Sequence, residues 1–372
     1  MLLTIANVPR DYAWGSDSLI ADLEGRAPSG SPEAEVWFGD HPGDPADVDG
    51  GGTLDAVTGG TLPYLLKLLA AAAPLSIQVH PTRDQAREGF AREAGRDAAD
   101  PARNYRDDNH KPELIVALSD RFEALGGLRP VADTLRLLSG FPDSSGVDEL
   151  RSRLGGDEAA ALRATIGWLL SGGAQAAVDE IIEGLAEADA DGFAETLRAV
   201  RGIAERNPGD PGVVVALLMN HLVLRPGEAI FLRAGLLHAY ISGLGVEIMA
   251  ASDNVLRGGL TPKHIDVGEL LAVVDTTPGE VPVQAPAGGD VTSYDIPVDD
   301  FALRRVQVAG ETRVPVAGPA MALVVAGSIT VAAGSGPERP VRAGAAAFAT
   351  ADETELALRG TGQVFIAEPG RA

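Results

Sequence analysis

Residues 213–252 read VVVALLMNHLVLRPGEAIFLRAGLLHAYISGLGVEIMAAS, and this stretch sets the expectation for the fold. It is rich in Val, Ile and Leu, and the turns RPGE and SGLG interrupt it. Short apolar runs separated by Gly and Pro turns predict β-strands. His238 and Glu247 lie within the apolar runs, so the same stretch places two titratable side chains on predicted strands.

The chain on either side of this stretch divides into ranges that differ in the spacing of apolar residues and in turn residues. Residues 1–128 mix short apolar runs, such as AEVWFG and PELIVAL, with Gly and Pro turns, which again predicts strands. Residues 129–207 carry apolar residues at three- and four-residue spacing with abundant Ala, Leu and Glu, which predicts several helices. The run PYLLKLLAAAAP (63–74) fits either a helix or a buried strand, because its periodicity does not decide.

These ranges predict a mainly β protein with a helical insert. Residues 1–128 and 208–284 would form one β domain, a sandwich or barrel that is interrupted in sequence and rejoined in space. Residues 129–207 would form the helical domain. Residues 285–372 alternate Val, Ala, Thr and Gly, which predicts a second, C-terminal β domain.

Composition narrows the possible partners. The chain has 372 residues and no cysteine, so disulfides and thiolate metal sites are excluded and any metal must be held by His, Gln or carboxylates. A formal net charge of −23 disfavours nucleic acid and anionic membranes as partners. The N-terminus does not read as a signal peptide and no long apolar run occurs, so we expect a cytoplasmic protein.

Only three of the 30 basic residues are lysines. They are Lys67, Lys111 and Lys263, and the last two lie inside the motifs described next. A lysine supplies a compact, strongly hydrated point charge. An acidic protein that binds an anionic small molecule needs such a local concentration of positive charge.

Two motifs place polar side chains on one strand face each. In SIQVHP, residues Ser76, Gln78 and His80 alternate with apolar residues, so they would share a face while Ile77 and Val79 point into the core. In NHKPEL, the proline favours an extended chain, and the ammonium of a lysine and the carboxylate of a glutamate would share a face. Each motif alone also fits an ordinary half-buried strand or a solvated loop.

The third and fourth motifs follow the helical range. His238 lies among apolar residues in AGLLHAY, where a lone histidine is more often a satisfied core residue than a ligand. Glu247 alternates with apolar neighbours in GVEIMA, which places a carboxylate on a strand face. Asp253 and Arg257 lie in the loop SDNVLRGG, where the alternative for the arginine is a surface salt bridge.

Taken together, the candidate ligands form a set of Gln, His, Glu and His without a thiolate. Such a set suits Zn²⁺ or another divalent first-row ion and leaves room for water or substrate. The occurrence of all four on predicted strands at both sides of one helical insert favours a metal site over the separate structural interpretations.

Six blocks in order resemble the type I mannose-6-phosphate isomerases, a family built on a cupin-like catalytic domain. The blocks are YAWG, AEVWFGDHP, SIQVHP, NYRDDNHKPELIVAL, HAYISGLGVEIMA and SDNVLRGGLTPKH. The resemblance implies a cupin-like jelly roll for residues 1–128 and 208–284 and a second cupin-like β-sandwich for residues 285–372.

The resemblance also implies roles for individual residues. It implies one Zn²⁺ per chain, a catalytic arginine and a set of substrate contacts. The implied metal ligands are Gln78, His80, Glu113 and His238; Arg257 is the implied catalytic arginine; Lys111, His110 and Asp253 are implied substrate contacts; and Ser76 and Lys263 are candidate phosphate contacts.

The expected reaction interconverts D-mannose 6-phosphate and D-fructose 6-phosphate, in mannose use or in the supply of GDP-mannose. Glu247 is the first candidate for the base that moves the proton, because burial raises the pKa of a carboxylate. Lys111 and His110 are the alternatives. The rival functions are isomerisation of another sugar phosphate and a non-catalytic metal-bearing cupin that binds sugar phosphate. We expect a monomer, with a dimer as the alternative.

Overall fold

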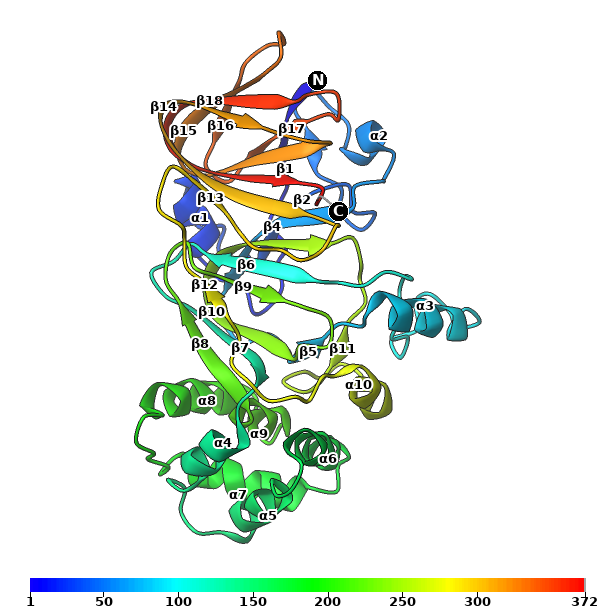
Figure 1. Ribbon diagram of the computed structural model, residues 1–372, viewed down its shortest axis with the longest axis vertical. Coiled ribbons are helices and arrows are strands. Elements are labelled where there is room, and N and C mark those ends of the chain that lie inside the picture. The colour runs from blue at the N-terminus through cyan, green and yellow to red at the C-terminus, as the bar shows by residue number, and fades with distance from the viewer. Residues whose placement is uncertain (371–372) are drawn as a thin grey trace.

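The computed structural model describes residues 1–370 and has three parts along its long axis (Figure 1). Helices lie at one end, an eight-stranded sheet lies at the other end, and a ten-stranded sheet lies between them. The predicted mainly β fold with a helical insert is therefore confirmed. Residues 371 and 372, the last two of the predicted C-terminal domain, lie outside the described residues.

The middle sheet takes strands from both sides of the helical part. For example, β6, which precedes the helices in sequence, pairs antiparallel with β9 and β10, which follow them. The strands are β2 (Glu35–Phe38), β4 (Tyr64–Ala71), β5 (Gln78–Val79), β6 (Glu113–Ala117), β7 (Phe122–Leu128), β8 (Met219–Leu224), β9 (Ala229–Leu232), β10 (His238–Ala250), β11 (Leu256–Arg257) and β12 (Val283–Gln284).

Strand β10 connects the two halves of this sheet. Its first part pairs with β5 and β7, and its second part pairs with β4 and β6. Between them stands Gly243, which has a φ of 117°, a conformation that residues with a Cβ rarely adopt. A Cβ at this position would also lie 2.9 Å from the carbonyl oxygen of Arg121. Glycine therefore allows one strand to serve both halves.

The undecided run at residues 63–74 forms the buried strand β4. All eight of its residues are buried, because the strand is hydrogen bonded on one edge to β2 and on the other to β10. A strand enclosed in this way shows no polar face, and its sequence therefore lacks the alternation that identifies a half-buried strand.

The helical part shares an apolar cluster with one side of the middle sheet. Ile77 and Val79, which flank Gln78, are fully buried in the same apolar cluster as the helices, so the prediction that they point into the core is confirmed. The helices are α4 (Val131–Leu138), α5 (Ser145–Arg153), α6 (Glu158–Leu170), α7 (Gln175–Leu185), α8 (Ala194–Arg206) and α9 (Gly212–Leu217).

The prediction of a strand at the start of VVVALL was wrong. Residues 212–217 form helix α9, and the strand β8 begins only at Met219. Every residue of α9 is buried, since the helix packs among the other helices and at the edge of the sheet. A short apolar run that is buried on all sides carries no periodicity that separates helix from strand.

The C-terminal sheet includes two strands from the start of the chain. The structure thus differs from the predicted division, which gave all of residues 1–128 to the first β domain. The strands are β1 (Leu2–Ala6), β3 (Asp47–Val48), β13 (Val291–Ser293), β14 (Ala302–Pro315), β15 (Ala320–Ala333), β16 (Arg339–Arg342), β17 (Ala346–Ala349) and β18 (Glu355–Glu368).

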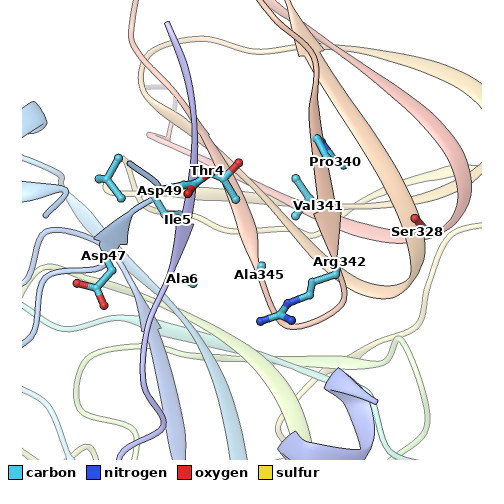
Figure 2. Close-up of a pocket in the computed structure, with 11 residues that line it drawn as sticks. Thr4, Ile5, Ala6, Asp47, Asp49, Ser328, Pro340, Val341, Arg342 and Ala345 are labelled. Carbon is cyan, nitrogen blue, oxygen red and sulfur yellow. The ribbon is translucent and has the colours of Figure 1, made fainter. Parts of the chain in front are cut away.

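The N-terminal strand is held at this seam by backbone and side-chain contacts. β1 pairs antiparallel with β17, and the amino group of Met1 donates to Thr350 Oγ1 at 2.5 Å and to Glu353 Oε1 at 2.8 Å. A hollow of about 530 Å³ lies beside the seam, and Figure 2 shows Asp47 and Arg342 among the side chains that line it. None of the motif residues line it.

Four more helices occupy the connections between strands. Thr82 caps the longest of them, α3, by accepting from the backbone of Gln85, whose side chain accepts from the Thr82 backbone in return. Among residues 1–370, no helix has both the length and the apolar character needed to cross a membrane. The four helices are α1 (Leu19–Glu24), α2 (Asp55–Thr58), α3 (Arg83–Arg92) and α10 (Val267–Val273).

The positive φ and close packing of Gly243 predict the effect of a single methyl group. Gly243→Ala should lower the free energy of unfolding by about 2–4 kcal/mol, because it adds a steric clash to an unfavourable backbone conformation. Gly310→Ala is the matched control, since Gly310 also has a positive φ, of 98°, but has open space around its Cβ position. Urea unfolding of both variants measures the difference, and equal losses would contradict the clash.

Candidate active site

A cavity of about 580 Å³ opens on the middle sheet. The strand register explains its lining, because directly paired residues in antiparallel strands point to the same face. Lys67 pairs with Trp37 on one side and with Glu247 on the other, and Glu113 pairs with Met249. The predicted site residues that line the cavity are Ser76, Gln78, Lys111, Glu113, His238, Glu247, Asp253, Arg257 and Lys263.

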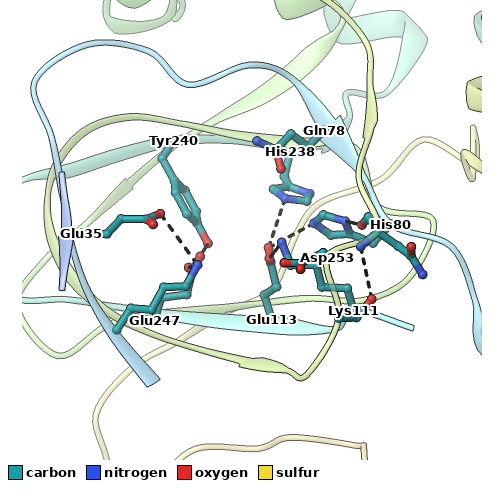
Figure 3. A network of polar contacts seen from close by, with 12 residues as sticks. Glu35, Gln78, His80, Lys111, Glu113, His238, Tyr240, Glu247 and Asp253 are labelled. Atoms are coloured by element: carbon teal, nitrogen blue, oxygen red, sulfur yellow. Dashed lines mark hydrogen bonds and ion pairs between the residues drawn. The ribbon is translucent and has the colours of Figure 1, made fainter. Parts of the chain in front are cut away.

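Three buried side chains converge at the base of the cavity (Figure 3). His80 Nε2 and His238 Nε2 lie 3.4 Å and 3.3 Å from the same atom, Glu113 Oε2. The Nδ1 atom of His80 lies 2.7 Å from the carbonyl oxygen of Asn254, and that of His238 lies 3.0 Å from the carbonyl oxygen of Leu236. Each carbonyl accepts from an Nδ1–H, and the Nε2 of each ring faces Glu113.

This arrangement fits a bound cation. Burial lowers the pKa of His80 to about 4, so its imidazole is neutral at ordinary pH. Its Nε2 is buried and has no hydrogen-bond partner, which costs free energy unless a ligand occupies the position. Two lone pairs and a carboxylate repel one another, and a divalent ion at their centre replaces the repulsion with attraction.

Gln78 adds an oxygen on the same side. It pairs directly with His238 across β5 and β10, and its side-chain nitrogen donates to Ser76 Oγ at 3.2 Å. The amide oxygen therefore remains for a metal ion. Lys111 lies on the other side of the group, with its Nζ 3.1 Å from Glu113 Oε1. The structure thus brings together every side chain of the predicted ligand set.

A second polar group occupies the wall opposite the histidines. The Tyr240 hydroxyl donates to Glu247 Oε1 at 2.8 Å, and the Nζ of Lys67 lies 3.3 Å from Glu247 Oε2 and 3.8 Å from Glu35 Oε1. Trp37 Nε1 donates to Glu35 at 2.7 Å. Burial raises the pKa of Glu247 and the neighbouring ammonium of Lys67 counteracts that rise. Burial alone would lower the pKa of Lys67, but the two carboxylates outweigh it and raise the value.

Positive charge that has no acidic partner within residues 1–370 lies at the mouth of the cavity. Burial, together with the nearby charge of Arg106, lowers the pKa of Arg257. Burial and the charge of Arg257 lower the pKa of Lys263 in the same way. The predicted alternative for Arg257, a surface salt bridge, is absent among residues 1–370. Cations that destabilise one another in this way favour an anionic ligand.

Asp253 is oriented by a histidine outside the predicted set. The backbone N–H of Gly43 donates to His41 Nδ1 at 3.0 Å, so the proton of that ring is on Nε2. Nε2 lies 3.0 Å from Asp253 Oδ2 and donates to it. This hydrogen bond lowers the pKa of Asp253, which keeps its carboxylate ionised at the edge of the cavity.

Comparison with known proteins identifies the family. Residues 2–131 match the family model for the catalytic domain of type I phosphomannose isomerase. The mannose-6-phosphate isomerase of Escherichia coli K12 is 35% identical over 390 residues, which cover 97% of each chain. That of Salmonella typhimurium is 36% identical over 391 residues, again 97% of each. The chain belongs to the type I phosphomannose isomerase family.

A solved structure extends the likeness to the whole fold. The mannose 6-phosphate isomerase of Salmonella typhimurium, bound to its substrate fructose 6-phosphate and to zinc, superimposes with a TM-score of 0.89 at 34% identity. The superposition covers all of both chains. The family resemblance, the isomerase class and the cupin-type catalytic fold expected from the six sequence blocks are thereby confirmed.

His110 is the one predicted site residue that lies away from the others. It does not line the cavity, and its Nε2 lies 2.7 Å from Asp300 Oδ2 in the C-terminal part of the chain. His80 is also absent from the cavity lining, but its Nε2 lies 3.4 Å from Glu113 Oε2, so it stays beside the other proposed ligands. The alternative that His110 acts as the base therefore has no support from its position.

Several cavity residues were not singled out from the sequence. They are Tyr12, Trp14, Glu35, Trp37 and Tyr240, and His41 stands behind Asp253. Lys67 was noted from the sequence but was given no role there. Two signals were present: Tyr240 follows His238 at the two-residue spacing of one strand face, and Lys67 is one of three lysines and lies in an otherwise apolar run. The role of Lys67 could not be inferred from the sequence, because only the pairing of β4 with β10 brings its partner Glu247 beside it.

Removing one histidine should separate metal binding from folding. His238→Ala should weaken zinc binding by roughly 100-fold or more, because the site loses a nitrogen ligand in a rigid, buried set. His221→Ala is the control, since the side chain of His221 is equally buried but bonds to Glu123 outside the cavity. Zinc content after gel filtration measures the effect, and full zinc occupancy in His238→Ala would exclude this ligand.

Proposed function

We propose that this cavity interconverts D-mannose 6-phosphate and D-fructose 6-phosphate by moving a proton between C1 and C2 through an enediolate. The observation that carries the proposal is the convergence of His80, Glu113 and His238 on one buried point below a group of unpaired cations. The activity of the family's curated members and the relative bound to fructose 6-phosphate support it.

The proposed metal is one Zn²⁺ per monomeric chain, held by Gln78, His80, Glu113 and His238. The donor set supports this assignment, because it offers two neutral imidazoles, a carboxylate and an amide oxygen without a thiolate. Zinc in such a site supplies a Lewis acid that withdraws electron density from a carbonyl or hydroxyl oxygen. The Lys111 ammonium, 3.1 Å from the free oxygen of Glu113, holds that carboxylate in place.

The proposed phosphate contacts are Lys263 and Ser76. Arg257 and Lys263 lie together at the cavity mouth without carboxylate partners among the described residues. Burial and the charge of Arg257 lower the pKa of Lys263, and a phosphate there would counteract both effects. Because the whole protein is acidic, with a net charge of −23, this local positive charge has a specific use in attracting an anion.

Glu247 is the proposed base. Its two carboxylate oxygens are bonded to different groups, one to the Tyr240 hydroxyl and the other to the Lys67 ammonium. Both partners favour the ionised form, whereas burial favours the protonated form. A carboxylate under such opposed influences can accept a proton from C2 and return it to C1 without a large change in free energy.

Two further cations stabilise the intermediate. The enediolate concentrates negative charge on the oxygens of C1 and C2, and Lys111 and Arg257 both line the cavity that would hold it. Arg257 remains charged at any physiological pH, and partial burial strengthens its attraction for an anion. The Nζ of Lys111 lies 3.1 Å from Glu113 Oε1, which holds this side chain beside the proposed metal ligands.

A coupled assay with mannose 6-phosphate tests the function directly. Turnover that a chelator abolishes and added zinc restores is the expected result. Zinc binding without turnover of any sugar phosphate would favour the non-catalytic cupin. Faster turnover of a different aldose phosphate would favour the isomerase with another preferred substrate, and activity that resists the chelator would remove the metal from the proposal.

Glu247→Gln should lower turnover by about 10²–10⁴-fold. The amide keeps the shape and the hydrogen bond from Tyr240 but cannot accept the proton. The C2 proton of mannose 6-phosphate should then cease to exchange with deuterated solvent while zinc content stays at the wild-type level. Retained exchange would remove Glu247 from this role.

The wild-type pH profile provides a second measurement of the same group. Only ionised Glu247 accepts a proton, and burial raises its pKa above the ordinary value of 4.5. The kcat should therefore fall as the pH is lowered through a value above 4.5, and the fall should persist in a control such as Asp299→Ala, which changes an exposed carboxylate outside the cavity.

A further inference from the structure

One carboxylate from the C-terminal part of the chain contacts two segments of the middle sheet at once. Asp300 Oδ1 lies 2.9 Å from Arg83 Nη2, and Asp300 Oδ2 lies 2.7 Å from His110 Nε2. Arg83 Nη2 is also 2.7 Å from His110 Nε2, so the three side chains form one compact group. The side chain of Asp300 is only 8% exposed, which makes these its principal polar partners.

The two contacted segments are those that carry the proposed metal ligands. Arg83 opens helix α3 three residues after His80. His110 stands three residues before Glu113, at the entrance to β6. None of Asp300, Arg83 and His110 lines the cavity. The group therefore joins the end of one ligand segment to the start of another from outside the site.

The chemistry of the group favours a fixed geometry. The guanidinium of Arg83 is always charged, so it donates to Asp300 as an ion pair. Burial alone would raise the pKa of Asp300, but the hydrogen bond from His110 and the charge of Arg83 outweigh it and lower the value. An ionised Asp300 at 2.7 Å favours a proton on His110 Nε2 that is donated to Asp300. That nitrogen then accepts nothing from Arg83, so the arginine and the histidine are joined through Asp300.

We propose that Asp300 is a positioning residue for the metal site. By holding Arg83 and His110 together, it fixes the distance between His80 and Glu113, and through Glu113 it fixes Lys111. The C-terminal part of the chain thereby contributes to catalysis without touching the substrate. The inference rests on the proposed function, because it takes His80 and Glu113 as metal ligands.

The test uses three variants of the full-length chain. Asp300→Ala removes both contacts, Asp300→Asn keeps the shape and allows one hydrogen bond, and Asp299→Ala removes a neighbouring exposed carboxylate as the matched control. Zinc affinity is measured by competition with a chelator, and the visible spectrum of the Co²⁺-substituted protein reports the coordination geometry. The melting temperature of each variant is recorded in parallel.

We expect Asp300→Ala to weaken zinc affinity by about tenfold and to alter the Co²⁺ spectrum. It should lower kcat more than it raises KM, because the phosphate contacts stay in place. Asp300→Asn should lie between Asp300→Ala and wild type, and Asp299→Ala should match wild type. If Asp300→Ala does not fold, Arg83→Gln and His110→Gln each remove one arm and should each give part of the same effect.

One outcome for Asp300→Ala would overturn the inference. A lower melting temperature with unchanged zinc affinity and an unchanged Co²⁺ spectrum would show that Asp300 only joins two parts of the fold, and would overturn the inference. If the wild-type chain binds zinc but does not isomerise sugar phosphates, the proposed function fails while the effect of Asp300 on zinc affinity can still be measured. The two failures are thus distinguishable.

Discussion

The pairing of β10 with four other strands is the constraint on which the site depends. Its first part contacts β5 and β7, its second part contacts β4 and β6, and Gly243 permits the bend between them. This pairing sets His238 opposite Gln78 and Glu247 opposite Lys67. The metal ligands and the candidate base therefore reach one cavity because a single strand carries them through both halves of the sheet.

The cavity contains more buried charge than a stable core requires. Lys67, Glu35, Glu247 and Glu113 are each less than 9% exposed, and removing charges from water is costly unless each one is paired. Here each ammonium faces carboxylates, and each carboxylate has a hydrogen-bond donor or a cation beside it. Such a balance is retained for chemistry rather than for stability, because apolar residues of the same size would pack at lower cost.

The sequence was sufficient for the fold class, the family and the strand faces, because alternation and turn residues are local signals. It was insufficient where burial is complete. The apolar run of α9 was taken as a strand, and β4 could not be assigned, because neither has a polar face. His41 was missed, and Lys67 was noted without a role, for another reason: each acts on a partner that is distant in sequence. The roles of the predicted site residues stay predictions, although nine of them line one cavity.

The first strand of the protein has a consequence for how the chain is made. β1 finds its partner in β17, so Leu2 pairs with Ala349, and the amino terminus is bonded to the loop just after that strand. During synthesis β1 emerges long before β17, and an unpaired strand edge is prone to aggregation. One edge of β1 can pair early with β3, but its other edge must wait for β17 to emerge, so this pairing is a late step in closing the C-terminal sheet.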